Sequence, residues 1–103
     1  MVVDKYIARL IRYGSTLMVN ICDEELLGKT VEGNGLKMHI SESYFSGDKV
    51  DLNEALDLIR KSNSSNLVGS RIVKNTLQAN LASKLAVKKV GSTLFLIIFK
   101  FCS

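Results

Sequence analysis

The sequence predicts a single α+β domain, in which an antiparallel sheet of two or more hairpins carries two helices packed on one face. Three observations predict this class. Residues 5–22 and 84–101 each have two strand-like arms around a Gly-Ser pair, and the chain between them holds two stretches with apolar residues at helical spacing. The order of strands, then helices, then strands is typical of α+β domains. At 103 residues the chain has the size of one domain, so we expect residues 1–103 to form a single unit.

The two predicted hairpins turn at Gly14-Ser15 and Gly91-Ser92. Glycine followed by another residue suits a two-residue type II′ turn, in which glycine takes a positive φ. Apolar and polar residues alternate through residues 17–22, as in a half-buried strand. Residues 94–99 are instead apolar on both faces, which predicts a central strand or an edge strand covered by a partner.

Between the first hairpin and the helices, the sequence predicts three short elements. Residues 23–28 predict one helical turn, capped by Asp23 and closed by Gly28. Residues 36–41 alternate and predict a half-buried strand. Residues 42–50 are rich in serine and glycine and predict a loop.

The first predicted helix begins at Asp51, which forms a carboxylate variant of the capping box with Glu54. Its apolar residues fall on one face, and it ends at Arg60-Lys61, where the helix dipole favours cations. The second predicted helix occupies residues 64–80 and buries a ridge of Val68, Ile72 and Thr76. Gly69, near its start, allows close backbone approach.

Charge divides the chain into two halves. Residues 1–57 hold all ten acidic residues and six basic ones, a net charge of −4, whereas residues 58–103 hold eight basic residues and no acidic one, a net charge of +8. Such asymmetry indicates an anionic partner. Ordinary solvated helix faces mix both signs, which is why an acid-free half is informative.

Cysteine usage and hydropathy predict a cytoplasmic protein that is not in a membrane. Cys22 and Cys102 are the two cysteines and have no C-x-x-C spacing, so a disulfide framework is not expected and a reducing compartment is. Charged residues interrupt the N-terminal stretch where a signal peptide would need an apolar segment. The longest apolar run, residues 94–99, is too short to span a bilayer as a helix.

The second half of the chain supplies the candidate RNA-binding residues. On the second predicted helix, two cations and two amides are spaced i, i+3, i+4 and i+7, and so form an outward stripe without a carboxylate. Such a set suits phosphates and base edges. The candidates are Arg60, Lys61, Arg71, Lys74, Asn75, Gln78, Lys84, Lys88 and Lys89. An ordinary solvated face is the competing interpretation.

Motifs for catalysis, nucleotides or metals are incomplete, so no cofactor and no metal are expected. Gly28-Lys29-Thr30 resembles the end of a phosphate-binding loop, but Asp23 stands where that loop needs a glycine. His39 is expected to face solvent or a partner, without an oriented nucleophile. Cys22 lies beside three carboxylates, which should hold its proton more tightly. In the loop, Phe45 is expected to bury, and Tyr44 is equally suited to burial or to stacking on a base.

Three segments together resemble archaeal domain-of-unknown-function family 424: residues 22–30, Ser43-Tyr44-Phe45-x-Gly47 and Asn66-Leu67-Val68-Gly69. The likeness covers residues 5–91. It implies a small archaeal cytoplasmic protein with no established activity that belongs with the translation machinery. Residues 92–101 depart from the family's pattern, because they are nearly all apolar and lack its proline and histidine.

The predicted function is that of a non-enzymatic RNA-binding protein of the translation machinery, bound to the ribosome. Its expected partners are ribosomal RNA and, beside it, ribosomal proteins or translation factors. One alternative is an interaction module whose acidic surface, Asp23–Glu25 with Asp48 and Asp51, engages a basic protein. A second alternative is a small enzyme that uses His39 with Cys22 or nearby carboxylates.

Overall fold

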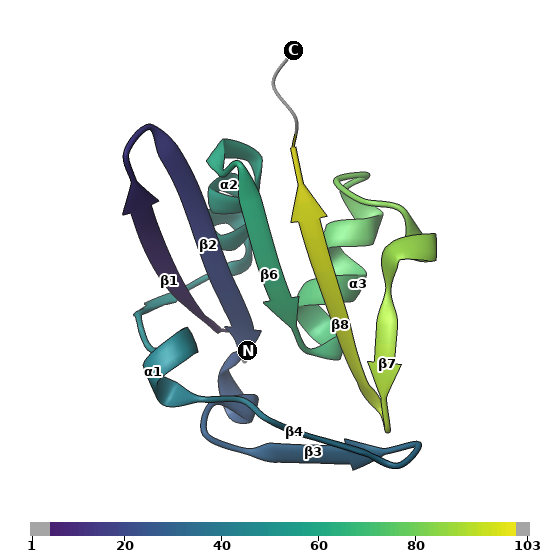
Figure 1. Ribbon diagram of the computed structural model, residues 1–103. Helices are drawn as coiled ribbons and strands as arrows, with labels where there is room; N and C mark the ends of the chain where they lie inside the picture. The colour runs from purple at the N-terminus through teal and green to yellow at the C-terminus, as the bar shows by residue number, and fades with distance from the viewer. Residues whose placement is uncertain (1–4, 101–103) are drawn as a thin grey trace.

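A computed structural model describes residues 5–100 (Figure 1). Cys102 and the end of the second predicted hairpin at residue 101 lie outside these residues. The strands are β1 (Tyr6–Tyr13), β2 (Thr16–Asp23), β3 (Thr30–Gly33), β4 (Leu36–His39), β5 (Asp48–Val50), β6 (Ser64–Val68), β7 (Lys88–Val90) and β8 (Thr93–Phe99). The α-helices are α1 (Glu42–Phe45), α2 (Leu52–Lys61) and α3 (Ser70–Gln78), with 3₁₀ turns η1 (Glu24–Leu26) and η2 (Lys84–Ala86).

Six strands form one sheet in the order β5-β1-β2-β6-β8-β7, and β3 and β4 form a separate hairpin. Helices α2 and α3 both lie behind the six-stranded sheet in Figure 1, and the β3–β4 hairpin crosses its lower end. The α+β class, with two helices on one sheet face, is confirmed. Both predicted hairpins, β1–β2 and β7–β8, belong to the one sheet.

The prediction that the second helix begins at residues 64–66 is wrong. Residues 64–68 form strand β6, which pairs parallel to β2 and antiparallel to β8. The sheet is therefore mixed rather than wholly antiparallel, and the second helix is the shorter α3. Strand β8 lies between β6 and β7, so the prediction of a central strand for residues 94–99 is confirmed.

Alternation along the strands divides the core into two layers. Side chains on the helix-covered face pack with α2 and α3 into a cluster that includes Tyr6, Val19, Ile21, Leu67, Ile72 and Leu96. On the other face, Ile7, Cys22 and Val68 form a smaller cluster with Ile40 and Phe45. The predicted burial of Phe45 is thus confirmed, although residues 42–45 form one turn of helix instead of a loop.

Two glycines fix the β3–β4 hairpin against the end of the sheet. A Cβ atom on Gly33 would stand 2.1 Å from the Gly91 nitrogen, and one on Gly91 would stand 2.4 Å from the Glu32 carbonyl oxygen. Side chains are therefore excluded where the hairpin crosses the β7–β8 turn. This close crossing lets the hairpin form a wall above the sheet.

Helix α3 is capped by a residue far away in the sequence. The Asp23 carboxylate accepts hydrogen bonds from the backbone N–H groups of Arg71 (3.0 Å) and Ile72 (2.9 Å). Asp23 makes no side-chain cap on η1, so its predicted local role is wrong. Gly69 has a φ of 128°, and a Cβ there would lie 2.3 Å from the Asp23 carboxyl carbon, so the predicted close approach at this glycine is confirmed.

Helix α2 follows its sequence signals. The Asp51 side chain accepts from the Glu54 N–H at 2.9 Å, and Glu54 accepts from the Asp51 N–H, which completes the predicted capping box. The helix ends at Lys61, as predicted. Its last carbonyls, of Ile59 and Arg60, accept from the Lys100 ammonium group, a cation at the negative end of the dipole.

Candidate functional site

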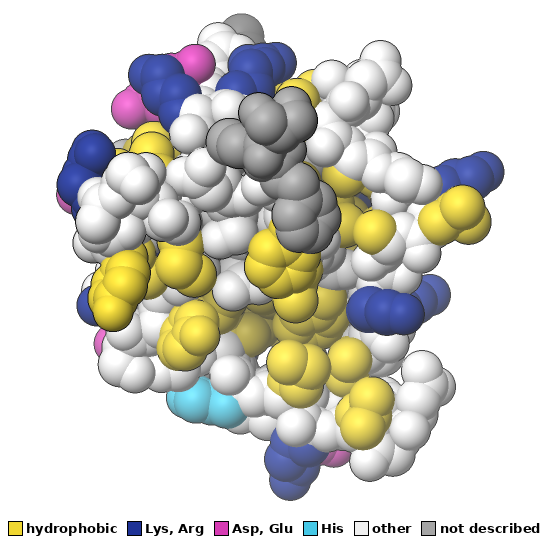
Figure 2. All heavy atoms as spheres, turned by 45° about the horizontal axis from the view of Figure 1, so that its top comes forward, with side chains coloured by type: hydrophobic (Ala, Val, Ile, Leu, Met, Phe, Trp, Pro, Cys, Tyr) yellow, Lys and Arg dark blue, Asp and Glu magenta, His cyan; other side chains and the backbone are white. Residues whose placement is uncertain are grey.

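The face of the sheet opposite the helices is only partly covered. At its lower end the β3–β4 hairpin and α1 cover the row Ile7–Cys22–Val68–Phe95, whose members pair across four strands. The next row outward on this face is Arg9–Asn20–Asn66–Ile97, and within residues 5–100 no second layer covers its β8 end. Figure 2 shows hydrophobic side chains gathered over the middle of this face, with Lys and Arg side chains around its border.

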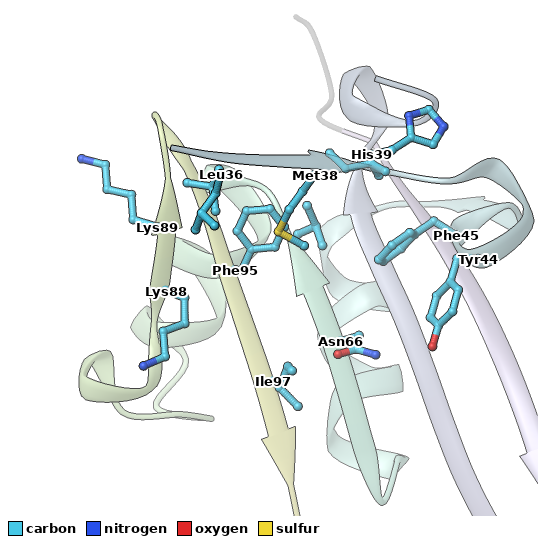
Figure 3. Close-up of a pocket in the computed structure, with 13 residues that line it drawn as sticks. Leu36, Met38, His39, Tyr44, Phe45, Asn66, Lys88, Lys89, Phe95 and Ile97 are labelled. Atoms are coloured by element: carbon cyan, nitrogen blue, oxygen red, sulfur yellow. The ribbon is translucent and has the colours of Figure 1, made fainter. Parts of the chain in front are cut away.

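A hollow of about 550 Å³ lies between this open face, the hairpin and α1 (Figure 3). Most of its lining is apolar, and the hairpin contributes one wall through Leu36 and Met38. The lining residues are Leu36, Met38, His39, Ile40, Tyr44, Phe45, Asn66, Val68, Lys88, Lys89, Val90, Phe95 and Ile97. The ring of Tyr44 is 58% exposed and stands at the border of the hollow.

Amide groups connect the floor of the hollow to α1. The buried Asn20 donates from Nδ2 to the Tyr44 carbonyl oxygen at 3.1 Å, and its Oδ1 accepts from Asn66 Nδ2 at 3.3 Å. The Arg9 guanidinium donates to the carbonyl oxygen of Ser43 in the same helix. These contacts hold α1 on the sheet and fix which way the Asn66 amide faces.

Among residues 5–100, no carboxylate lines this hollow or the two smaller hollows beside it. The cationic residues around the three are Lys88 and Lys89 at one border and Arg9 at the other, and the Lys89 side chain points away from the hollow (Figure 3). The charge of this region is therefore positive, and it adjoins an apolar cavity.

The nine predicted RNA-binding residues do not share one surface. Lys88 and Lys89 are exposed on the edge strand β7, beside the open face, and Lys84 is exposed on the preceding turn η2. Lys74 and Gln78 are exposed on α3, on the helix side of the sheet. Arg60 and Lys61 lie at the end of α2, where Lys61 forms an ion pair with Asp57 at 2.8 Å.

The expectation of an outward stripe without a carboxylate is wrong for Arg71, which pairs with Glu25, and Asn75 is half-buried with its amide bonded within the molecule. Arg71 Nη2 lies 2.7 Å from Glu25 Oε1, and the guanidinium carbon is 5.1 Å from the centre of the Tyr6 ring. Asn75 donates to the Arg71 carbonyl oxygen at 2.8 Å. The carboxylate comes from η1, which is distant in the sequence, so residue spacing within the helix cannot predict this contact.

The acidic segment Asp23–Glu25 is paired within the molecule. Glu24 contacts the Lys49 ammonium at 2.6 Å, and Asp23 is buried beneath α3. Burial raises the pKa of Asp23, although the N–H groups of Arg71 and Ile72 oppose that rise. Burial also raises the pKa of Glu25, but the hydrogen bonds and charge of Arg71 outweigh it, so the net shift is downward.

His39 and Cys22 do not form a catalytic pair. His39 is exposed, as predicted, and its Nδ1 lies 3.1 Å from the Thr30 hydroxyl. Cys22 is fully buried, and burial followed by the charges of Asp23 and Glu25 raises the pKa of its thiol to about 12, the predicted direction. Within residues 5–100, no three His, Cys, Asp or Glu side chains gather where they could hold a metal ion.

The structure also bears on the Gly28-Lys29-Thr30 segment and on the question of a membrane-spanning helix. Thr30 begins strand β3, so Gly28-Lys29-Thr30 leads into a strand and not into the helix that follows a phosphate-binding loop. None of the helices formed by residues 5–100 combines the length and the apolar character needed to cross a bilayer.

Sequence reasoning missed the row Arg9–Asn20–Asn66–Ile97, of which Asn66 and Ile97 line the hollow, while Arg9 and Asn20 line the smaller hollows beside it. A signal for two of them was present, because Arg9 and Asn20 are polar residues that alternate with apolar ones in the predicted strands. Asn66 was assigned to a helix start. Only the pairing of β2 with β6 brings the two amides together.

The comparisons concern the fold and the family. Residues 11–101 match the family described as a protein of unknown function, DUF424, so the match includes most of the segment expected to depart from it. No curated protein is significantly similar to the chain. The crystal structure of an uncharacterized conserved protein from Methanopyrus kandleri has the same fold, with a TM-score of 0.74 and 23% sequence identity over 91% of this chain and 90% of that one.

Proposed function

Because the chain belongs to DUF424, a family of unknown function, we propose its function from its own surface: it binds RNA without catalysing a reaction. The proposed partner is ribosomal RNA, which brings the protein to the translation machinery and to neighbouring ribosomal proteins or translation factors. The choice of ribosomal RNA follows the translation setting that the family resemblance implies. The proposed phosphate-binding side chains are those of the exposed cations after residue 58.

The observation that carries the proposal is how charges are paired. Carboxylates of the first half are partly neutralised within the molecule, through Glu24–Lys49, Glu25–Arg71 and Glu32–Lys37. Among the ion pairs of residues 5–100, none involves Lys74, Lys84, Lys88 or Lys89. The four exposed lysines therefore remain available for phosphates, whose binding by lysine and arginine supplies most non-specific RNA affinity.

The same pairing weighs against the two alternatives. A basic protein partner would have to compete with Lys49 and Arg71 for Glu24 and Glu25, and Asp23 is not accessible to it. An enzyme using His39 with Cys22 would need an ionised thiol, and the raised pKa of Cys22 opposes ionisation.

The proposal is tested by charge reversal at two places on the sheet. Lys88→Glu with Lys89→Glu alters β7, whereas Lys5→Glu with Arg12→Glu makes the same charge change in β1 and directly before it, four strands away in the sheet. We expect the β7 variant to bind ribosomal RNA at least tenfold more weakly, since each lost phosphate contact lowers the slope of log K against log salt by about 0.7–0.9. The β1 variant should keep the slope of the parent.

Binding is measured by fluorescence anisotropy over a range of salt, and by co-sedimentation of the full chain with ribosomal particles. Circular dichroism verifies that both variants are folded. Equal losses in the two variants would show a response to net charge alone and would contradict a localised RNA surface. A parent protein that neither binds RNA at low salt nor sediments with ribosomal particles refutes the function itself.

A further inference from the structure

We infer that the hollow on the open sheet face receives an unpaired nucleobase of single-stranded RNA, with Asn66 contacting the edge of the base and Tyr44 stacking on it. This inference rests on the proposed function and extends it by naming the site and the form of the RNA. Lys88 and Lys89 on one side and Arg9 on the other would then contact the phosphates that flank the base.

The first step is the apolar surface left open to water. The walls of the hollow include Met38, Phe95 and Ile97, and Ile97 is 54% exposed on the open face. Larger exposed apolar patches mark places where a ligand or partner sits. The flat ring of a nucleobase can pack against such an apolar surface. Tyr44 at the border has an exposed ring on which the base can stack (Figure 3).

The second step is the orientation of the Asn66 amide. Asn20 donates to the Tyr44 carbonyl oxygen, so its own amide oxygen is turned toward Asn66 and accepts one of the two Nδ2 hydrogens. Asn66 Oδ1 and the second Nδ2 hydrogen remain as a neighbouring acceptor and donor, and Asn66 lines the hollow. Asparagine uses this pair to make two hydrogen bonds to a base edge, as with adenine.

The positive charge around the hollow favours an anionic ligand. Among the described residues that line the hollow and the two smaller hollows there is no carboxylate, and the cationic ones are Arg9, Lys88 and Lys89, of which Lys89 points its side chain outward (Figure 3). In a duplex the base edges are stacked and paired and would not reach the bottom of the cavity, whereas the bases of a single strand can be turned out. An acidic peptide with apolar side chains is the competing ligand, and because its backbone C=O and N–H groups can also pair with the Asn66 amide, the binding test includes such a peptide.

The test measures binding of labelled single-stranded homopolymers of A, C and U, and of an RNA duplex, to the full chain. Tyr44→Ala is matched by Tyr13→Ala, which removes an equally large exposed ring at the end of β1. Asn66→Ala is matched by Asn53→Ala on the solvent side of α2, with Asn66→Ser as a second variant if the first does not fold.

We expect Tyr44→Ala to weaken single-strand binding about tenfold, which is within the range for one stacked base. Asn66→Ala should reduce the differences in affinity among the three homopolymers. The two control variants should bind as the parent does, and the parent should prefer single strands over the duplex.

Three results would overturn the inference. In the first, Tyr44→Ala and Asn66→Ala both keep the RNA affinity and the base preference of the parent, while Lys88→Glu with Lys89→Glu weakens binding. This result would leave the proposed function intact and refute only the base-binding site. Another is equal affinity for duplex and single strand. The third is protection of Tyr44 from iodination by an acidic apolar peptide and not by RNA. An absence of all RNA binding refutes the proposed function as well.

Discussion

Two adjacent rows of the sheet, one residue apart on each strand, meet very different surroundings. Ala8, Ile21, Leu67 and Leu96 pair across β1, β2, β6 and β8 and are all buried beneath the helices. Each is followed or preceded directly by a member of the row Arg9–Asn20–Asn66–Ile97 on the opposite face. The same backbone thus carries an apolar row and a row that is mostly polar.

Because the second row is mostly polar, we infer that the domain does not depend on apolar packing over this row for its stability. Apolar side chains at Asn20 and Asn66 would suit a sheet buried on both sides, as is typical of parallel α/β sheets. Here the amides hold α1 through the Tyr44 carbonyl oxygen and leave hydrogen-bonding groups facing the hollow. Polar groups kept in that position indicate a surface for contact with a ligand.

The largest difference in stability between the two rows is expected on β8. Leu96→Ala removes a side chain that is 1% exposed beneath the helices, and we expect it to lower the free energy of unfolding by about 2–5 kcal/mol. Its neighbour Ile97 is on the open face, and Ile97→Ala should cost less than about 1 kcal/mol. Urea denaturation measures both values. Similar losses in the two variants would mean that the open face is covered in solution.

A smaller effect is expected where the helix layer is anchored to the sheet. Asp23→Ala removes the carboxylate that accepts from the Arg71 and Ile72 N–H groups, one of which is buried, and should cost about 2 kcal/mol. Glu24→Ala serves as the control, because it removes a partly exposed ion pair with Lys49 that is worth less than about 1 kcal/mol. If thermal melts show equal losses, Asp23 does not act as the cap of α3.

The smallest expected effect is the pH dependence that Asp23 and Glu25 produce in opposite directions. The pKa of Asp23 is raised above 3.8, so the folded state binds more protons than the unfolded state, and this contribution to stability is lost as pH rises through the folded pKa. The pKa of Glu25 is lowered below 4.5, so its contribution is present above 4.5 and is lost as pH falls through the folded pKa.

Asp23→Asn and Glu25→Gln separate the two contributions. Melting temperatures between about pH 3 and pH 6 should depend more steeply on pH in Asp23→Asn than in the parent, because the opposing Asp23 contribution is removed while those of Glu25 and Asp57, whose pKa is lowered by Lys61, remain. They should depend less steeply in Glu25→Gln. The reverse pattern would show that the directions assigned to the two shifts are wrong.

Much of the fold could be predicted from short sequence motifs, because the contacts that these motifs make in the structure are between residues close in the sequence. The Gly-Ser turns, the Asp51–Glu54 capping box and the cations ending α2 all act within a few residues. Strand β6 was missed because Ser64 and Asn66 lie on the open face, where apolar residues are not required, and Ser65 is a serine buried beneath the helices. A strand with two apolar residues out of five gives no clear alternation.

The candidate site was less accessible to sequence reasoning than the fold. Its lining residue Asn66 is hydrogen-bonded to Asn20 of another strand, and other lining residues come from the β3–β4 hairpin, α1, β7 and β8. Likewise, Arg71 was assigned to a free stripe because its partner Glu25 lies 46 positions earlier. Such contacts depend on strand order, which no spacing within one segment encodes. Lys88 and Lys89, by contrast, were predicted from charge alone and do border the hollow.

The position of β6 has a consequence for how the molecule folds. The two outer hairpins make no strand pairing with each other, and each is joined to the sheet through this one five-residue strand. Hairpins form within microseconds, but the parallel pairing of β2 with β6 must close a long loop that contains α2 and the β3–β4 hairpin. We therefore expect docking of β6 to be the step at which two locally formed halves become one cooperative unit, and to limit the folding rate.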